Sequence, residues 1–362
     1  MPPPRSLEEL RTEIDRLDDR LIKLLNQRAA VVVQVGELKS RTKSVYFTPD
    51  REKRVYQRVL EQNRGPLDDA SVRAIYREII AACLSLERPL RVACLGPEGT
   101  FSHEALERQF GTRAEAVLLP SFSAVFDEVE HGRVDYGIVP VENSTHGVVA
   151  ETLDRFVASP LNIKSEALLR IDQCLLSKSG RVDRIKRIVS HPQSLGQCRQ
   201  WLAEHLPQVP LEEVASNARA AERARDDSGV AAVAGLTAAH RYKLRVVARN
   251  IQDQANNFTR FFVIGRDPIA KASGDDKSSL LLSVSHTAGA LHRVLKPFAD
   301  HQVSLCSIES RPLKGRPWEY LFFLDLVGHV DEPRVKRALA AVAKRCHAVK
   351  VLGSYPAALP PP

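Results

Sequence analysis

The stretch Asn257-Phe258-Thr259-Arg260-Phe261 runs directly into the apolar residues Phe262, Val263 and Ile264. This run predicts a β-strand. Because side chains alternate across a strand, Phe258 and Arg260 share one face and Thr259 points from the other. The strand therefore carries a hydroxyl and a guanidinium side by side at its polar end. An edge strand with ordinary solvated residues would have the same sequence pattern, so other parts of the chain are needed to distinguish a functional strand from an ordinary one.

The composition is that of a globular protein with two or three domains: 362 residues, of which 44% are hydrophobic. No apolar run approaches the ~20 residues that span a bilayer, and the amino terminus lacks the apolar core of a signal peptide. We therefore expect a cytoplasmic protein with no membrane partner. The net charge of +8 is interleaved with acidic residues. Small anionic substrates or a solvated basic surface explain it, and we expect no nucleic-acid partner.

The cysteines lie far apart in the sequence, with no Cys-x-x-Cys pair and no paired histidine ligands. This spacing favours reduced, mostly buried thiols over a disulfide framework. We expect no metal site.

Residues 1–90 form the first predicted domain, which is helical from residue 6 to residue 87. Ser6 and Glu9 make a capping box, and apolar residues then recur at positions 7, 10, 14, 17, 21, 24, 31, 35 and 38. A helix of this length is ~50 Å long, and so small a module cannot cover the apolar seam by itself. We therefore expect a homodimer or higher homo-oligomer in which two chains pair their long helices. Shorter helices are predicted at 49–63 and 68–87.

The second predicted domain, residues 91–268, alternates strands with helical stretches, a pattern that places ligand crevices at the carboxyl ends of the strands. Its strands are predicted at 91–95, 136–140, 187–190, 230–233 and 260–264. Residues 265–277 read as a linker. The third predicted domain, residues 278–358, has the ferredoxin-like order βαββαβ. Its strands are predicted at 280–284, 303–309, 320–326 and 348–352, and its helices near 288–300 and 332–345.

Charged side chains interrupt the apolar pattern of the helical domain. Arg28 takes a seam position where another leucine would fit, and a buried arginine is costly unless it meets an anion. Lys39 shares the helix face of Arg28, whereas Arg11 lies too far round to serve the same pocket and could serve a partner's. Glu87 continues an apolar stripe on the last helix. These groups bind an anionic ligand, or they form salt bridges among themselves.

The helical domain resembles the all-helical class of chorismate mutase over residues 6–87, on the spacing of Arg11, Arg28, Lys39, Arg51 and Glu52. The resemblance implies that chorismate is rearranged to prephenate without a nucleophile or cofactor. The roles it implies are carboxylate binding by Arg28 and a partner's Arg11, contacts to the ether oxygen by Lys39 and Glu87, and ordering of the polar rim by Arg51 and Glu52.

Departures from that family occur at Thr48, where a carboxylate often sits, at Cys83, which replaces a serine, and at Glu87, which replaces a glutamine. Thr48 therefore lacks the carboxylate contact that the family makes at this position, and Cys83 lacks the hydroxyl contact. The third makes mutase activity depend on a proton, because a carboxylate cannot donate a hydrogen bond.

Polar motifs of the second domain resemble those of prephenate dehydratase over residues 91–266. They are Gly96-Pro97-Glu98-Gly99-Thr100-Phe101-Ser102, Val141-Glu142-Asn143-Ser144, Ser190-His191-Pro192-Gln193 and the Thr259 stretch. The resemblance implies that Thr259 is, or orients, the general acid for the departing ring hydroxyl. It also implies a two-lobed α/β fold like that of type II periplasmic binding proteins. The implied substrate-binding residues are Thr100, Ser102, Glu142, Asn143, Ser144, Ser190, His191, Asn257 and Arg260.

The third domain resembles an ACT domain. Two segments match the regions that bind phenylalanine in this family, namely Gly289, Ala290, Leu291 and Glu309, Ser310, Arg311, Pro312. A glycine lets a ligand's amino and carboxyl groups approach the backbone, although Ala288 replaces the usual preceding proline. A ferredoxin-like domain used only for dimerisation would have the same fold.

These resemblances predict a bifunctional enzyme that makes prephenate from chorismate and phenylpyruvate from prephenate, with feedback inhibition by L-phenylalanine. Two alternatives stay open. One is a dehydratase that prefers arogenate, the transaminated substrate. The other is a non-catalytic amino-acid sensor or binding protein built on the two-lobed fold.

Overall fold

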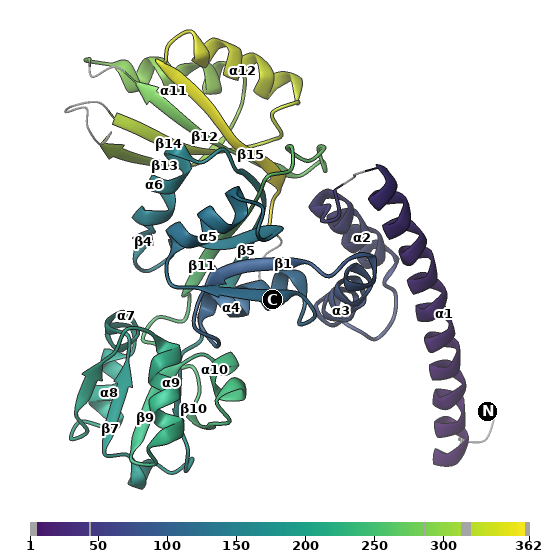
Figure 1. Cartoon of the computed structure of the whole chain (residues 1–362), viewed down its shortest axis with the longest axis vertical. Helices are drawn as coiled ribbons and strands as arrows, with labels where there is room; N and C mark the ends of the chain where they lie inside the picture. The colour runs from purple at the N-terminus through teal and green to yellow at the C-terminus, as the bar shows by residue number, and fades with distance from the viewer. Residues whose placement is uncertain (1–5, 43–44, 285–286, 313–319, 359–362) are drawn as a thin grey trace.

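The computed structural model describes residues 6–42, 45–284, 287–312 and 320–358, and it shows a helical module, a two-lobed α/β module and a C-terminal α+β module (Figure 1). The helical module consists of α1 (Leu7–Thr42), α2 (Pro49–Gln62) and α3 (Asp69–Glu87). The predicted capping box is confirmed, because Ser6 N–H donates to the Glu9 carboxylate at 2.8 Å and Glu9 N–H donates to Ser6 Oγ at 3.2 Å. Within the described ranges no helix is long and apolar enough to cross a membrane.

The apolar seam of α1 is exposed in the single chain. Leu10, Ile14, Leu17, Leu21 and Leu24 are each between 42% and 61% exposed. Helix α1 extends away from the rest of the chain in Figure 1. Near its carboxyl end it packs closely on α3, where a Cβ added to Gly36 would lie 2.9 Å from the Glu87 Cα.

The first lobe of the α/β module is a mixed sheet with strand order β2-β1-β3-β11-β5 and with β4 beside β3. Strands β1 and β3 are parallel, so their carboxyl ends meet at one edge, while β11 runs antiparallel between β3 and β5. The strands are β1 (Arg91–Leu95), β2 (Glu115–Leu119), β3 (Tyr136–Asn143), β4 (Gly147–Val148), β5 (Asn162–Arg170) and β11 (Phe258–Gly265). The helices are α4 (Phe101–Phe110), α5 (Phe122–Glu130) and α6 (Ala150–Ala158).

The second lobe is a sheet with strand order β10-β6-β9-β7-β8, in which β7 and β9 are parallel. Its strands are β6 (Cys174–Ser177), β7 (Arg187–Ser190), β8 (Leu211–Glu213), β9 (Val230–Ala234) and β10 (Arg245–Ala248). Its helices are α7 (Pro192–Gln197), α8 (Arg199–His205), α9 (Asn217–Asp226) and α10 (Leu236–Arg241), and η1 (Val182–Arg184) is a short 3-10 turn. The chain enters this lobe after β5 and returns before β11, so two segments connect the lobes. The predicted two-lobed arrangement is confirmed.

The C-terminal module has the predicted order βαββαβ and a sheet ordered β13-β14-β12-β15. Its elements are β12 (Asp276–Val284), α11 (Ala290–Asp300), β13 (Leu305–Pro312), β14 (Tyr320–Val327), α12 (Pro333–Ala343) and β15 (Ala348–Pro356). Strands β12 and β13 both run antiparallel to β14. The segment before α11 and the end of β13 therefore lie at the same edge of the sheet.

The predicted linker is wrong at its carboxyl end, because residues 276 and 277 belong to β12. The β15 strand likewise continues beyond residue 352 to Pro356. Both extensions pack against the first lobe, where Leu352 and Tyr355 share a hydrophobic core with Val139 and Phe156. A Cβ on Gly353 would lie 2.4 Å from the Ile163 carbonyl oxygen. The two modules therefore share buried apolar surface as well as a covalent connection.

Candidate functional site

Polar side chains meet where β3 ends and β11 begins. Thr259 lies opposite Asn143 in the ladder, and Asn143 Nδ2 donates to Thr259 Oγ1 at 2.9 Å and to Asn257 Oδ1 at 2.9 Å. Asn143 is 7% exposed and Asn257 is 1% exposed. Ser144 Oγ donates to the Asn256 carbonyl at 2.9 Å, which fastens the end of β3 to the segment before β11. The structure thus brings Asn143, Ser144, Asn257 and Thr259 together.

The orientation of the Asn143 amide follows from its other edge. Its Oδ1 accepts the backbone N–H groups of Thr145 and His146, each at 3.1 Å, so the amide nitrogen has to face Thr259. The Thr259 oxygen is then the acceptor in that bond. Its hydroxyl proton stays available for another acceptor, so the site can present Thr259 as a donor to a ligand.

A second polar group lies at the carboxyl end of β7. The hydroxyls of Ser190 and Ser194 lie 3.1 Å and 2.9 Å from Asn217 Oδ1, and Ser190 Oγ donates to the Val233 carbonyl at 2.6 Å. His191 caps α7, and its Nδ1 accepts the Gln193 N–H at 3.3 Å. Asn217, the first residue of α9, therefore accepts the Ser194 hydroxyl, while the single proton of the Ser190 hydroxyl goes to the Val233 carbonyl.

Hydrogen bonds connect the two groups across the lobes. His146 Nδ1 lies 3.1 Å from Asn143 Oδ1 and 3.2 Å from Gln197 Nε2 on α7. Gln173, in the connection between the lobes, donates to Gln197 Oε1 and Ser194 Oγ, each at 3.1 Å. Thr259 and Ser190 therefore belong to one polar network that spans both lobes.

Thr100 and Ser102 lie after β1, at the sheet edge that also holds the end of β3. Thr100 caps α4, since its hydroxyl donates to the Leu95 carbonyl at 2.9 Å and accepts the His103 N–H at 3.2 Å. Ser102 is buried in the first turn of α4. Both hydroxyls are near the helix amino terminus, which favours an anion.

Glu142 and Arg260, which were expected to bind substrate, point to the opposite face of the sheet from Thr259. They face each other across β3 and β11 and line a small cavity beneath the C-terminal module. Arg260 Nε donates to Glu166 at 2.7 Å and Nη1 to Asp325 at 2.5 Å, while Nη2 donates to Tyr355 Oη at 3.1 Å. Because side chains alternate along a strand, Arg260 and Thr259 serve different faces of the sheet, and substrate binding by Glu142 and Arg260 stays a prediction.

In the helical module, the predicted cluster forms where α1 meets α3. Lys39 Nζ contacts Glu87 Oε2 at 2.7 Å and donates to the Tyr46 carbonyl at 3.2 Å. The Arg28 guanidinium donates to the Cys83 thiol. Arg11 is exposed and lies roughly 25 Å along the helix axis from Arg28. Within one chain Arg11 cannot join the cluster, as the sequence spacing predicts.

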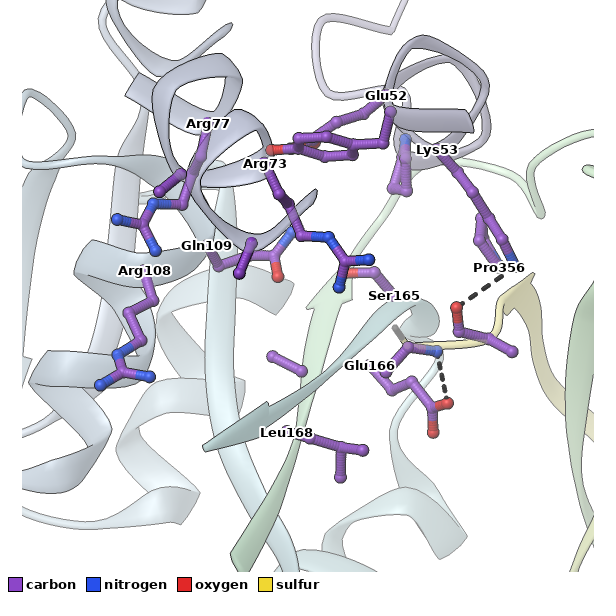
Figure 2. Close-up of a pocket in the computed structure, with 17 residues that line it drawn as sticks. Glu52, Lys53, Arg73, Arg77, Arg108, Gln109, Ser165, Glu166, Leu168 and Pro356 are labelled. Carbon is purple, nitrogen blue, oxygen red and sulfur yellow. Dashed lines mark hydrogen bonds between the residues drawn. The ribbon is translucent and has the colours of Figure 1, made fainter. Parts of the chain in front are cut away.

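Glu52 faces a different cavity, which Figure 2 shows between α2, α3, α4, β5 and the residues after β15. It accepts a hydrogen bond from Tyr56 Oη at 3.2 Å. Burial raises the pKa of Glu52 to about 7, against the lowering effect of that hydrogen bond. Arg51 is exposed. Helix α2 turns its Glu52 face toward α3, so the structure does not place Glu52 or Arg51 with Lys39 and Glu87.

The predicted effector segments lie at one edge of the C-terminal sheet. Gly289 precedes α11 with φ +74°, in the left-handed region that favours glycine, and Ala290 begins the helix. Leu291 follows in the first turn. On β13, Glu309 lines the cavity that holds Arg260, and Arg311 forms an ion pair with Asp154 of α6 at 3.0 Å. Ser310 and Pro312 are exposed.

The sequence patterns do not identify several residues of the site, among them Gln173, His146, Ser194 and Gln197. Thr145 and His146 directly follow the Glu142-Asn143-Ser144 motif, and Ser194 and Gln197 lie three and six residues after His191, within the next two helical turns. Their nearness to the motifs was the available signal. For Gln173 the sequence gives no such signal, because this residue lies in the connection between the two lobes and contacts the site only in the folded structure.

Family comparisons match three successive parts of the chain. The family described as Chorismate mutase type II matches residues 10–88, Prephenate dehydratase matches residues 92–269, and ACT domain matches residues 278–344. A bifunctional chorismate mutase/prephenate dehydratase from Aquifex aeolicus is 44% identical over 98% of each chain. Another, from Stutzerimonas stutzeri, is 43% identical over 98% of each chain.

A solved structure also resembles this chain. The prephenate dehydratase of Arthrobacter aurescens, in complex with L-Phe, is 33% identical with a TM-score of 0.69, and the match covers 74% of this chain and 90% of that one. The similarity therefore includes the two-lobed and C-terminal modules together.

Proposed function

The chain belongs to the family of bifunctional chorismate mutase/prephenate dehydratases, and on that premise we propose which of its residues perform each reaction. The protein rearranges chorismate to prephenate and converts prephenate to phenylpyruvate. The sensor or binding-protein alternative is not favoured, because both catalytic modules are present over the whole chain.

In the dehydratase reaction, the electrons of the breaking carbon–carboxylate bond aromatise the ring and expel the ring hydroxyl. Thr259 donates its proton to that hydroxyl, which leaves as water. The hydrogen bond from Asn143 to Thr259 at 2.9 Å carries this assignment, because it fixes the threonine oxygen as an acceptor and turns the proton outward. The amide also stabilises the negative charge that develops on the threonine oxygen.

We assign binding of the two substrate carboxylates to polar side chains near Thr259, namely Thr100, Ser102, Ser144, Ser190, His191 and Asn257. To contact a carboxylate, the hydroxyls of Thr100, Ser144 and Ser190 have to turn away from the backbone carbonyls to which they donate. The amino termini of α4 and α7 add N–H groups that favour anions. Arogenate differs from prephenate in its side chain, and turnover of the two substrates by the same enzyme preparation decides between them.

For the mutase reaction, we assign Arg28 to a substrate carboxylate and the Lys39–Glu87 pair to the ether oxygen. Arg11 has to come from a second copy of the chain, since it lies roughly 25 Å from Arg28 on its own helix. The exposed seam of α1 supports such a homodimer. The polar-rim role of Arg51 and Glu52 stays a prediction from the family resemblance, because the single chain does not place them with Lys39 and Glu87.

L-phenylalanine is the effector that we assign to the C-terminal module, at Gly289 to Leu291 and Glu309 to Pro312. Support comes from Gly289, which has a left-handed φ of +74° and lies at the sheet edge shared by both segments. The domain limits of 1–90, 91–268 and 278–358 and the cytoplasmic location stay predictions.

Separate single substitutions test the two assignments. Thr259→Ala should abolish phenylpyruvate formation while chorismate is still consumed, and Arg28→Ala should stop chorismate consumption while added prephenate is still converted. Removing one acid or one carboxylate clamp should cost roughly 100-fold or more in the affected rate. Both reactions can be followed spectroscopically on the purified full chain.

Thr112→Ala and Arg41→Ala are the matched controls, because both side chains are exposed in the same modules. Each should retain both activities. Loss of both activities in either folded test variant would contradict the assignment to separate sites.

A further inference from the structure

Arg260 follows Thr259 on β11, and Glu142 precedes Asn143 on β3. Both charged side chains point to the opposite face of the sheet from Thr259 and Asn143. Thr259 pairs with Asn143 across the β11–β3 ladder, and in the next register position Arg260 pairs with Glu142. The ladder is irregular immediately afterwards, where the register shifts between Arg260 and Phe261. The acid and its hydrogen-bond donor on one face are thus backed by a guanidinium and a carboxylate on the other.

All three nitrogens of the Arg260 guanidinium have partners, and two of these partners belong to the C-terminal module. Glu166 comes from β5, whereas Asp325 comes from β14 and Tyr355 from β15. Ser279 of β12 closes the network through Asp325 at 2.5 Å and Tyr355 Oη at 2.6 Å. The side chain of Glu166 is 0% exposed and that of Arg260 is 12% exposed. A buried, fully bonded arginine has little freedom to move unless its partners move.

Strand β13, which carries one of the segments assigned to phenylalanine, reaches the cavity that contains Arg260. Asp325 lies opposite Ser307 of β13, and Ser307 and Glu309 line the cavity that contains Arg260 and Glu142. Glu309 is also the first residue of the segment that we assign to phenylalanine. A shift of β13 would therefore displace Asp325, which lies on the neighbouring strand β14.

We propose that Arg260 is a positioning residue that couples the C-terminal module to Thr259. Asp325 and Tyr355 hold the guanidinium in the position in which the adjacent Thr259 points its proton at the substrate. Effector binding at the end of β13 shifts Asp325, releases or moves Arg260, and misplaces the acid. A displacement of about 1 Å at a reacting group costs roughly 100-fold in rate. This inference rests on the proposed role of Thr259.

Asp325→Asn tests the proposal without touching the dehydratase lobe. The amide keeps an oxygen for Ser279 but removes the charge that Arg260 contacts. We expect the dehydratase kcat to fall roughly 10- to 100-fold, with a smaller change in the KM for prephenate and with mutase activity unchanged. L-phenylalanine should still bind by calorimetry, yet it should inhibit the residual activity less than it inhibits the wild type. Tyr355→Phe should act in the same direction with a smaller effect.

Lys350→Met is the matched control. Lys350 also joins the two modules, through the carbonyls of Phe156 and Ser159 at 2.9 Å and 2.5 Å, and it is not among the contacts of Arg260. It should retain wild-type kcat and inhibition. Arg260→Lys should recover part of the kcat that Arg260→Met loses, because it keeps the charge without the planar fork. Melting temperatures identify any variant that fails to fold.

Two results would overturn the coupling. One is wild-type kcat and inhibition in folded Asp325→Asn and Tyr355→Phe, and the other is an equal loss in Lys350→Met, which would mean general loosening of the interface. Thr259→Ala separates this failure from failure of the proposed function. If Thr259→Ala is inactive while Asp325→Asn is normal, the coupling alone is wrong, whereas an active Thr259→Ala would remove the catalytic assignment itself.

Discussion

The buried Glu166 and the half-buried Glu52 shift their pKa in opposite directions because their partners differ. Burial alone would raise the pKa of Glu166, but the nearby charges of Arg260 and Lys277 outweigh it and lower that pKa. Glu52 has a tyrosine hydroxyl as its hydrogen-bond partner, and burial raises its pKa to about 7. A paired carboxylate is thus charged in the folded state, while Glu52 is partly protonated near neutral pH.

Glu52→Gln should therefore stabilise the protein in alkaline buffer. The folded state holds the Glu52 proton more tightly than the unfolded state, so the contribution of Glu52 to stability falls as pH rises from about 4.5 to about 7. A neutral amide removes that fall. Because Glu52 keeps part of its surface exposed, we expect a gain of only about 1–2 kcal/mol in the free energy of unfolding at pH 8.

Denaturant unfolding of wild type and variant at pH 5 and pH 8 measures this effect. The exposed Glu61 lies on the same helix, so Glu61→Gln is the control and should show no pH-dependent gain. An equal gain at both pH values would assign the effect to something other than the Glu52 proton.

At the scale of elements, the sequence bounds the helices of the first and third domains but not those of the second. Local signals bound the helices: Ser6 with Glu9 caps α1, and Asp68 caps α3 by accepting the Ser71 N–H at 2.7 Å. The sequence pattern misses six strands, β2, β4, β5, β6, β8 and β10. In β5, the consecutive residues Lys164, Ser165 and Glu166 are 2%, 4% and 5% exposed. Three buried polar residues in a row carry no apolar alternation, so the pattern does not indicate a strand.

The candidate site shows the same division between local and distant information. Motifs place Asn143, Ser190 and Thr259 at strand ends, and the structure connects them. Glu166 and Asp325 lie 94 and 65 residues from Arg260 in the sequence. The contact with Glu166 depends on the pairing of β5 with β11, and the contact with Asp325 depends on how the C-terminal module docks. Local pattern encodes neither, although strand alternation already separates Arg260 from Thr259.

The α1–α3 junction leads to a prediction about the donor to the ether oxygen. Glu87 forms an ion pair with Lys39 at 2.7 Å, and a carboxylate cannot donate a hydrogen bond to the ether oxygen and would repel the negative charge that develops there. Glu87→Gln supplies a neutral donor at this position, although it gives up the ion pair with Lys39. We therefore expect the mutase kcat to rise in Glu87→Gln.

Initial rates over a range of chorismate concentrations provide the measurement. Glu37→Gln serves as the control, since Glu37 is an exposed residue of α1 close to the junction, and it should keep the wild-type kcat. A lower kcat in folded Glu87→Gln would show that the reaction needs the carboxylate and not a neutral donor at this position.

At the scale of the whole molecule, the modules differ in how far they depend on one another. The C-terminal module shares a buried core with the first lobe, including Leu281, Phe323 and Tyr355 against Val141 and Phe156. Deleting it would expose that core, so point substitutions are the better test of regulation. The amino-terminal half of α1, by contrast, leaves its apolar face uncovered by the described part of its own chain.

That uncovered face predicts that mutase activity requires a second copy, whereas dehydratase chemistry is complete within one. Leu24 is 61% exposed in the single chain. Leu24→Asp would lose about 1.5–3 kcal/mol of apolar burial per copy, or about 3–6 kcal/mol per dimer, which corresponds to roughly 10²- to 10⁴-fold weaker pairing of the helices. Mutase activity should fall and become dependent on protein concentration, because Arg11 of the other copy is lost from the site. Asn26→Asp places the same charge on the exposed opposite side of the helix and should leave both activities intact. Sedimentation and mutase assays across a dilution series measure the two effects. If Leu24→Asp keeps wild-type mutase activity at every concentration, the seam of α1 does not supply the second Arg11.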